Sequence, residues 1–201
     1  MSANHAAFNL IFRFVENYIS PIAGRISSQR HVMAIRDGFI SAMPFMIVGS
    51  FLLVFAYPPF SPDTTWGFAR AWLDLAKEFE GRILTPFDMT MGIMSIYICA
   101  AISYNLGKHY EKSNQLDPFM CAMLSIMAFL LSAAPKTNGT LPVDSLGGTG
   151  IFTAILVAIY CVEMMRFLKA HNIGIRLPDQ VPPMIKNSFD LLIPVLVVVL
   201  T

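Results

Sequence analysis

The sequence predicts an all-α integral membrane protein, a polytopic helix bundle that begins with an amphipathic helix. Of its 201 residues, 55% are hydrophobic and 13% are charged, whereas soluble globular proteins carry roughly 25% charged residues. Charge-free stretches recur along the chain, and the longest reach the length of about 20 residues that a helix needs to cross a bilayer. Lys and Arg total 14 and Asp and Glu total 13, so the charge balance gives no indication of nucleic acid as a partner.

Residues 1–37 are expected to form a cytoplasmic amphipathic segment. Apolar side chains recur here at helical spacing, and Arg13 and Glu16 lie on other faces of the same helix. These two charges also interrupt the apolar core of a secretory signal, so the N-terminus is expected to be retained. Ser20 and Pro21 predict a break in the helix. Two placements remain open: the segment lies in the membrane surface with its arginines toward anionic lipid, or it packs on the protein's own cytoplasmic face.

Residues 38–201 are expected to hold four complete membrane spans and an incomplete fifth. The clearest span is residues 38–57, which has twenty residues without a charge and one proline, Pro44, that should kink it. The last span only begins, because the uncharged stretch after Asp190 has eleven residues and cannot cross. The expected spans are residues 38–57, 86–106, 118–134, 151–168 and, incomplete, 188–201.

Two helix starts are predicted from a capping residue followed by proline. Thr85 is expected to cap the second span, with Pro86 in its first turn and Asp88 facing the free amides. This structural explanation of Asp88 is preferred to a role in transport. Asp117 and Pro118 repeat the pattern at the start of the third span.

Residues 61–82, between the first two spans, predict an amphipathic helix outside the hydrocarbon. They carry seven charged side chains. Aromatic and leucine side chains are spaced along one apolar face: Phe68, Trp72, Leu75 and Phe79.

Polar groups near the spans have simple structural explanations. Glu163 and Arg166 are three residues apart near the end of the fourth span, which predicts an interfacial ion pair in preference to a buried functional carboxylate. Residues 147–150 are rich in glycine but lack the GK[ST] signature and preceding strand of a phosphate-binding loop, so a turn is expected. The acids near the spans, Asp88 and Glu163, do not form the paired titratable groups that an integral-membrane enzyme needs.

The three cysteines are expected to pack as small apolar side chains. Cys99, Cys121 and Cys161 each lie in a hydrophobic stretch, without a CxxC pair or a histidine at ligand spacing. No disulfide, metal site or cofactor is predicted.

The distribution of basic residues predicts a cytoplasmic N-terminus. With four spans, ten lysines and arginines flank the spans on the side of the N-terminus and four on the other side, and cytoplasmic loops carry the excess. The ten are Arg13, Arg25, Arg30, Arg36, Lys108, Lys112, Arg166, Lys169, Arg176 and Lys186, and the four are Arg70, Lys77, Arg82 and Lys136. This orientation places the connection between the fourth and fifth spans, residues 171–186, in the cytoplasm.

That connection is rich in proline. Residues 175–189 read IRLPDQVPPMIKNSF, and three prolines within six residues forbid a regular helix. The segment is expected to form a stiff cytoplasmic elbow with two roles open, a hinge or partner-docking site on the one hand and a purely structural corner on the other. The candidate hinge or docking residues are Arg176, Asp179, Pro182, Pro183 and Lys186.

The elbow closely resembles the LP-x-x-VPP-x-x-x-x-SF-x-x-LIP stretch of a known family. This family is the membrane-spanning IIC component, or permease, of the bacterial phosphoenolpyruvate-dependent sugar phosphotransferase system, in its lactose, cellobiose and diacetylchitobiose class. Other segments are similar to the same family, namely residues 34–40 (AIRDGFI) followed by Met43 and Pro44, residues 92–95 (GIMS) and residues 146–148 (LGG). The resemblance runs from about Phe8 and corresponds to the N-terminal half of the family's proteins.

The resemblance implies a multi-pass transport component of the bacterial cell membrane rather than an enzyme. Such permeases translocate a β-linked disaccharide of cellobiose, chitobiose or lactose type, which a partner IIB subunit phosphorylates with phosphate relayed through IIA. The first half is expected to form a homodimer, and the sugar-binding residues are expected beyond Thr201, so no substrate-binding or catalytic residue is assigned. An alternative is a truncated, non-transporting membrane scaffold that pairs with an intact permease.

Overall fold

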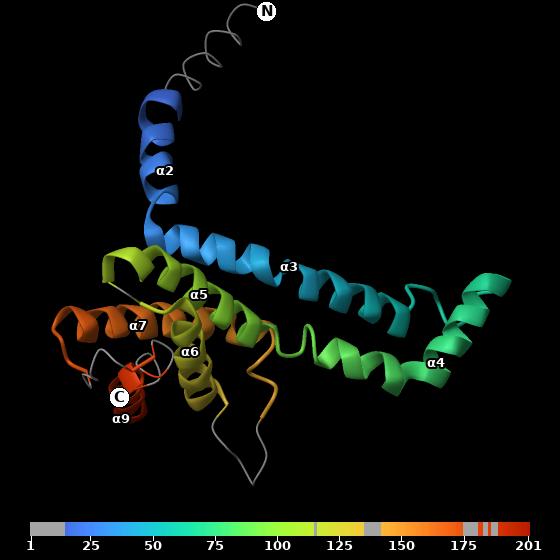
Figure 1. The fold of residues 1–201 in the computed structure, drawn as a ribbon. Helices are drawn as coiled ribbons and strands as arrows, with labels where there is room; N and C mark the ends of the chain where they lie inside the picture. The colour runs from blue at the N-terminus through green and yellow to red at the C-terminus, as the bar shows by residue number, and fades with distance from the viewer. Residues whose placement is uncertain (1–14, 115, 135–141, 175–180, 183–184, 186–188) are drawn as a thin grey trace, which may run out of the picture.

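The described part of the chain folds into helices joined by turns (Figure 1). The structure, a computed structural model, describes residues 15–114, 116–134, 142–174, 181–182, 185 and 189–201. The elements are the π-helical turn η1 (Val15–Ile19), α2 (Ser20–Ser27), α3 (Arg30–Ala56), α4 (Gly67–Asp88), α5 (Met94–Asn114), α6 (Pro118–Ala133), the 3-10 helix η2 (Gly148–Gly150), α7 (Ile151–Ala170) and α9 (Leu192–Leu200). No residue in the described ranges belongs to a β-strand, which agrees with the predicted all-α class.

Two of the described helices are long and apolar enough to cross a membrane. They are α3, with 27 residues, and the continuous helix Gly148–Ala170, with 23 residues. At about 1.5 Å per residue, both exceed the roughly 30 Å of bilayer hydrocarbon. Helix α3 continues through Pro44. The apolar helices α6 and α9 have 16 and 9 residues, which is fewer than the roughly 20 residues needed to span the hydrocarbon. The count of four complete spans and an incomplete fifth therefore stays a prediction.

Helix α5 lies at the centre of the bundle. It packs against α3 on one side and α7 on another, and α6 contacts both α5 and α7. Figure 1 shows α3, α5 and α7 running side by side while α6 crosses them. Helix α9 contacts α6 and α7, whereas α4 extends away from these helices and packs against the second half of α3.

The core consists of two clusters of buried side chains along α5. One contains Leu124 and Met165, from α6 and α7, and the other contains Ile98 and Phe129, from α5 and α6. Close contact between α3 and α5 depends on Gly38, because a Cβ there would lie 2.9 Å from the backbone nitrogen of Ile102. Small residues of this kind let helices in membranes approach each other closely.

The predicted start of the second span is wrong. Helix α4 runs through Pro86 to Asp88, and α5 begins at Met94. Thr85 is an interior helical residue, because its hydroxyl donates to the Gly81 carbonyl oxygen at 2.8 Å and its own carbonyl accepts from the amide of Met89 at 3.1 Å. A proline so near the end of a helix leaves one carbonyl without its usual donor, which is tolerable in a last turn.

The predicted start of the third span is confirmed. Asp117 has extended backbone angles, and its Oδ1 accepts hydrogen bonds from the amides of Phe119 (2.9 Å) and Met120 (3.3 Å). Pro118 occupies the first helical turn of α6, where its missing amide is not needed.

The predicted N-terminal segment divides into two parts in the structure. Residues 30–37 begin α3 and pack on the bundle, where Ala34 is fully buried, whereas α2 does not pack on the described part of it. Helix α2 has no buried residue, and Figure 1 shows it standing away from the other helices. The predicted break at Ser20 and Pro21 is wrong, because the described helix runs without interruption from η1 into α2 and is interrupted only at Ser28 and Gln29. Of the two placements left open by the sequence, packing on the chain's own described helices is observed for residues 30–37 and not for α2.

The glycine-rich residues form a turn that packs on α5. Ser95 donates its hydroxyl to the Gly147 carbonyl oxygen, and its amide donates to the Leu146 carbonyl oxygen at 3.0 Å. Phe129 of α6 lies against Gly150, where an added Cβ would approach the phenyl ring to 3.2 Å. These contacts agree with the expected turn rather than a phosphate-binding loop.

Candidate functional site

The elbow that carries the sequence-predicted site residues lies mostly outside the described residues. Arg176, Asp179, Pro183 and Lys186 are not described. Pro182 is described, and its carbonyl oxygen accepts a hydrogen bond from the amide of Ile185 at 3.0 Å. The hinge or docking role of the elbow therefore stays a prediction, while the residues at its two ends can be described.

Helix α7 ends in a left-handed cap that turns the chain into the elbow. Asn172 has φ 55°, a conformation that asparagine adopts more readily than most residues. The amide of Asn172 donates to the Lys169 carbonyl oxygen (3.0 Å), and the amide of Ile173 donates to the Leu168 carbonyl oxygen (2.9 Å). This pair of bonds is the Schellman arrangement, which satisfies carbonyls that the helix leaves free.

An ion pair ties the end of α7 to the start of the last helix. Lys169 Nζ lies 3.2 Å from Asp190 Oδ2, and both side chains are largely covered. The pair brings the two ends of residues 170–189 together. It therefore anchors the base of the elbow at one end of the bundle.

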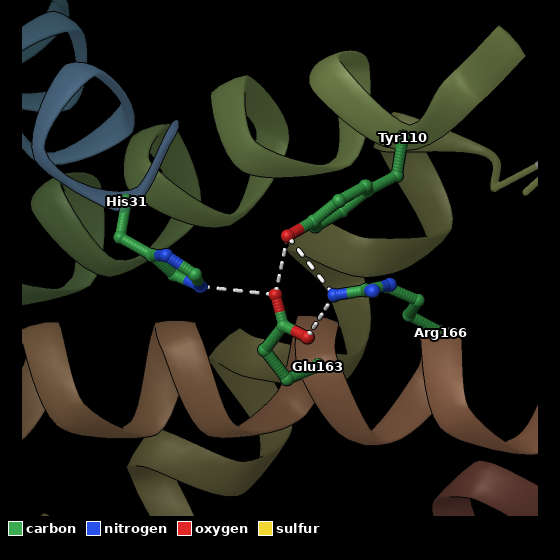
Figure 2. Close-up of polar contacts among 4 residues, drawn as sticks. All are labelled: His31, Tyr110, Glu163 and Arg166. Atoms are coloured by element: carbon green, nitrogen blue, oxygen red, sulfur yellow. Dashed lines mark hydrogen bonds and ion pairs between the residues drawn. The ribbon is translucent and has the colours of Figure 1, made fainter. Parts of the chain in front are cut away.

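A cluster of four polar side chains lies at the same end of α7 and joins three helices (Figure 2). At its centre is the carboxylate of Glu163, whose Oε1 accepts from the Tyr110 hydroxyl (2.6 Å) and from His31 Nε2 (2.9 Å). Arg166 Nη1 donates to Glu163 Oε2 (2.8 Å) and to the Tyr110 hydroxyl (3.3 Å). Because a carboxylate only accepts hydrogen bonds, His31 carries a proton on Nε2.

Two guanidinium groups lie near the Tyr110 ring. The Cζ atoms of Arg166 and Arg30 lie 4.7 Å and 5.5 Å from the ring centroid, within the range of cation–π attraction. Tyr110 is 1% exposed, so its ring is enclosed by protein while its hydroxyl reaches the carboxylate. The single carboxylate of the cluster is thus surrounded by more positive than negative charge.

The cluster is suited to holding helices together and not to catalysis. The carboxylate of Glu163 is occupied by three donors, so it is not free to act as a general base. It also lies in the last two turns of α7 and is 31% exposed, unlike a carboxylate buried in the middle of a span. Among the described residues, no group of three or more His, Cys, Asp and Glu side chains could hold a metal ion. The three cysteines are free and buried.

Half of this cluster was predictable from the sequence. The i,i+3 ion pair of Glu163 and Arg166 is confirmed at 2.8 Å. His31 and Tyr110 were missed, because they lie 132 and 53 residues from Glu163. Topology is the signal that could have found them. His31 precedes the first predicted span and Tyr110 follows the second, so the predicted orientation places both on the side of the membrane where the fourth span ends near Glu163.

The described residues form a helical bundle with two helices long and apolar enough to cross a membrane, which fits the class of helical membrane proteins. Comparison with known families agrees and is more specific. The family model of the phosphotransferase system EIIC components matches residues 36–201. The chain belongs to this family.

Individual relatives are similar over nearly the whole chain. The cellobiose-specific EIIC component of Geobacillus stearothermophilus is 35% identical over 93% of this chain and 43% of its own length. The lactose-specific EIICB component of Streptococcus mutans is 33% identical over 87% of this chain and 30% of its own length. The crystal structure of ChbC, the IIC component of an N,N'-diacetylchitobiose-specific phosphotransferase system, matches with a TM-score of 0.75 and 34% identity, over 94% of this chain and 45% of that one. The chain thus spans less than half the length of these relatives.

Proposed function

We propose that the chain is the N-terminal part of a sugar permease that translocates a β-linked disaccharide for phosphorylation by a partner IIB subunit. The observation that carries the proposal is the match of sequence and fold to EIIC proteins whose names specify cellobiose, lactose or diacetylchitobiose. Phosphoryl transfer in this proposal belongs to the IIA and IIB subunits. The chain itself supplies membrane helices and a polar cluster that holds three of them together.

Uptake of labelled disaccharides tests this proposal. Cells that produce the full-length protein with its cognate IIA and IIB should accumulate phosphorylated cellobiose, chitobiose or lactose, and cells without IIB should not. If all three sugars stay outside cells in which the protein is inserted and its partners are present, the substrate class is wrong.

The proposed topology has a cytoplasmic N-terminus, four complete spans and a fifth that continues beyond Thr201. The bias of basic residues supports this orientation. The polar cluster supports the alternation of the spans, irrespective of which side is cytoplasmic, because the start of α3 and the ends of α5 and α7 lie together. Labelling of single introduced cysteines from either side of the membrane gives the measurement. A residue in the α3–α4 connection that reacts only from the cytoplasm would contradict the orientation.

A homodimer is proposed from the resemblance of the chain to the first half of the family's proteins. Membrane helices associate through packing of complementary surfaces, and α3 exposes many large apolar side chains in the single chain. They include Ile40, Met43, Phe45, Ile47, Val48 and Phe51. Cross-linking of the full-length permease in its native membrane at low expression should yield dimers. Persistent monomers under those conditions would oppose the proposal.

The elbow is proposed as a hinge or docking site for the IIB subunit, through Arg176, Asp179, Pro182, Pro183 and Lys186. The ion pair of Lys169 with Asp190 supports this by anchoring the ends of the elbow at one end of the bundle. Charge reversal at Arg176 or Lys186 should slow phosphotransfer to bound sugar, whereas Arg70→Glu on α4 should not. Unchanged phosphotransfer in the folded variants would leave the elbow as a structural corner.

The alternative of a non-transporting scaffold makes a different prediction. A chain that ends at Thr201 would pair with an intact permease and change its activity without taking up sugar itself. Reading the gene beyond codon 201 separates the two ideas, because an in-frame continuation with further apolar segments belongs to a permease.

A further inference from the structure

An apolar groove lies between the end of α3 and helix α4. Its volume is about 560 Å³, which is within the range of about 300 to 1,000 Å³ found for small-molecule sites. Its lining residues include Phe55, Phe68, Ala71, Trp72, Phe79 and Arg82. Phe55 comes from the end of α3, a helix long and apolar enough to cross the membrane, and the other lining residues come from α4, so we expect lipid beside the end of α3 to reach the groove.

Aromatic side chains mark this end of α3 as a membrane boundary. The chain has two tryptophans, and both lie here. The Trp72 ring packs against Phe55, Phe60 and Phe68 with centroids 5.7 to 5.9 Å apart, and its indole N–H donates to the Phe55 carbonyl oxygen at 3.3 Å. Such amphipathic aromatic residues are enriched at the level of the lipid headgroups. The groove therefore opens where a lipid presents both its acyl chain and its phosphate.

One charged residue, Arg82, lines the otherwise apolar groove. Its Cζ lies 5.7 Å from the centroid of the Phe79 ring, and no carboxylate of the described residues forms an ion pair with it. An arginine beside an apolar groove at the headgroup level complements the two parts of an anionic lipid, because its stem packs on apolar surface while its guanidinium binds phosphate.

We propose that this groove binds an anionic phospholipid, with an acyl chain between α3 and α4 and the phosphate on Arg82. A zwitterionic lipid carries the same acyl chains but no net negative charge, so it fits the groove and lacks the electrostatic attraction. The proposal concerns the membrane boundary of the chain and does not depend on which sugar is carried.

Quenching of Trp72 by lipids with brominated acyl chains tests the proposal. The full-length protein is placed in nanodiscs of unbrominated phosphatidylcholine and titrated with brominated phosphatidylglycerol or brominated phosphatidylcholine. The Trp72 signal is the difference between Trp66→Phe and Trp66→Phe/Trp72→Phe. Phosphatidylglycerol should quench it at about fivefold lower concentration, because one arginine near the surface contributes an attraction of that size toward anionic lipid.

Matched variants assign the preference to Arg82. Arg82→Gln should abolish the difference between the lipids, whereas Arg70→Gln, on the same helix but outside this groove, should keep it. Ala71→Trp, from an exposed position on the groove wall, should fill the groove and reduce phosphatidylglycerol binding in native mass spectrometry.

Three results would overturn the proposal: equal quenching of Trp72 by both lipids, an equal loss of preference in Arg70→Gln, or disulfide-linked dimers formed by Ala71→Cys. The last result would show that a second copy of the chain occupies the groove. Near-identical circular dichroism and elution volume of all variants ensure that a loss of preference reflects binding and not misfolding.

Discussion

Among single residues, Glu163 makes the most polar contacts between helices. Its carboxylate accepts from His31, Tyr110 and Arg166, which belong to α3, α5 and α7. Hydrogen bonds to a charged group contribute more to stability than neutral ones, and removing the carboxylate takes away the ion-pair partner of Arg166. The cluster is partly exposed, so solvent reduces its contribution.

Replacing Glu163 should therefore loosen the bundle. Glu163→Ala is expected to lower the free energy of unfolding by about 1 to 2 kcal/mol, measured by thermal or denaturant unfolding in detergent. Glu111→Ala, an exposed acid near the same end of α5, is the matched control and should change little. An equal effect of the two variants would show that the cluster has no special role.

Asn172 offers a second test at this scale, because its φ of 55° is unfavourable for branched side chains. Asn172→Val should destabilise the end of α7 by about 1 to 2 kcal/mol, whereas Asn172→Gly should be neutral or slightly stabilising. Thermal unfolding of both variants gives the measurement. Equal stability would mean that the chain leaves α7 by another conformation.

Among the helices, the two predicted caps differ in outcome although they share the same residue pattern. Asp117 follows the end of α5 and caps α6. Thr85 lies inside α4, which begins at Gly67 and continues to Asp88. A threonine followed by proline is compatible with a helix start, but a hydroxyl that bonds back to the preceding turn fits an established helix as well. The residues at the proline could not distinguish these cases. What decides is whether the preceding residue is already helical, as it is before Thr85 and is not before Asp117.

The confirmed cap can be tested directly. Asp117→Ala should lower the free energy of unfolding by about 0.5 to 2 kcal/mol. Asp117→Ser should keep most of the stabilisation by the cap, because a serine hydroxyl accepts from the same amides. Chemical denaturation in detergent measures both. If serine were as damaging as alanine, a contact of Asp117 other than the cap would be responsible.

The contact of α3 with α5 provides the next prediction. Gly38→Leu places a side chain where the Ile102 backbone lies within 3.0 Å of the added Cβ, so it should force the helices apart and destabilise the bundle by about 1 to 3 kcal/mol. Gly24→Leu on α2 is the control, since nothing lies within 4 Å of that position. Unfolding of both variants in detergent measures the difference, and an unaffected Gly38→Leu would contradict the close approach.

For the whole molecule, composition and long apolar stretches were enough to predict the helical class, and the resemblance of the proline-rich residues 177–194 predicted the family. Contacts between distant segments were not predictable in the same way. His31 joins Glu163 across 132 residues, and no spacing along one helix encodes such a pair. The predicted topology did limit the possible partners of Glu163, however. The bias of basic residues places the start of the first span and the ends of the second and fourth spans on one side of the membrane, so partners of Glu163 were to be sought at that end of the bundle.

The base of the elbow leads to a prediction at this scale. Lys169→Glu should break the pair with Asp190 and speed proteolytic cleavage within residues 171–189, because the free energy needed to open the segment falls by about 0.5 kcal/mol. The reversed pair, Lys169→Glu with Asp190→Lys, should restore protection. Cleavage that stays fast in the double variant would assign the effect to another contact of Lys169.

The central position of α5 has a consequence for how the protein is made. Helix α5 does not meet the length and apolarity that α3 and Gly148–Ala170 satisfy, and it carries Ser95 and Ser103, both fully buried against neighbouring helices. A helix with buried hydroxyls is poorly suited to face lipid alone. During synthesis, α5 is therefore expected to leave the translocon together with α3. Its packing is expected to be complete only after α7 has been synthesised, so insertion of α5 depends on helices that precede and follow it in the sequence.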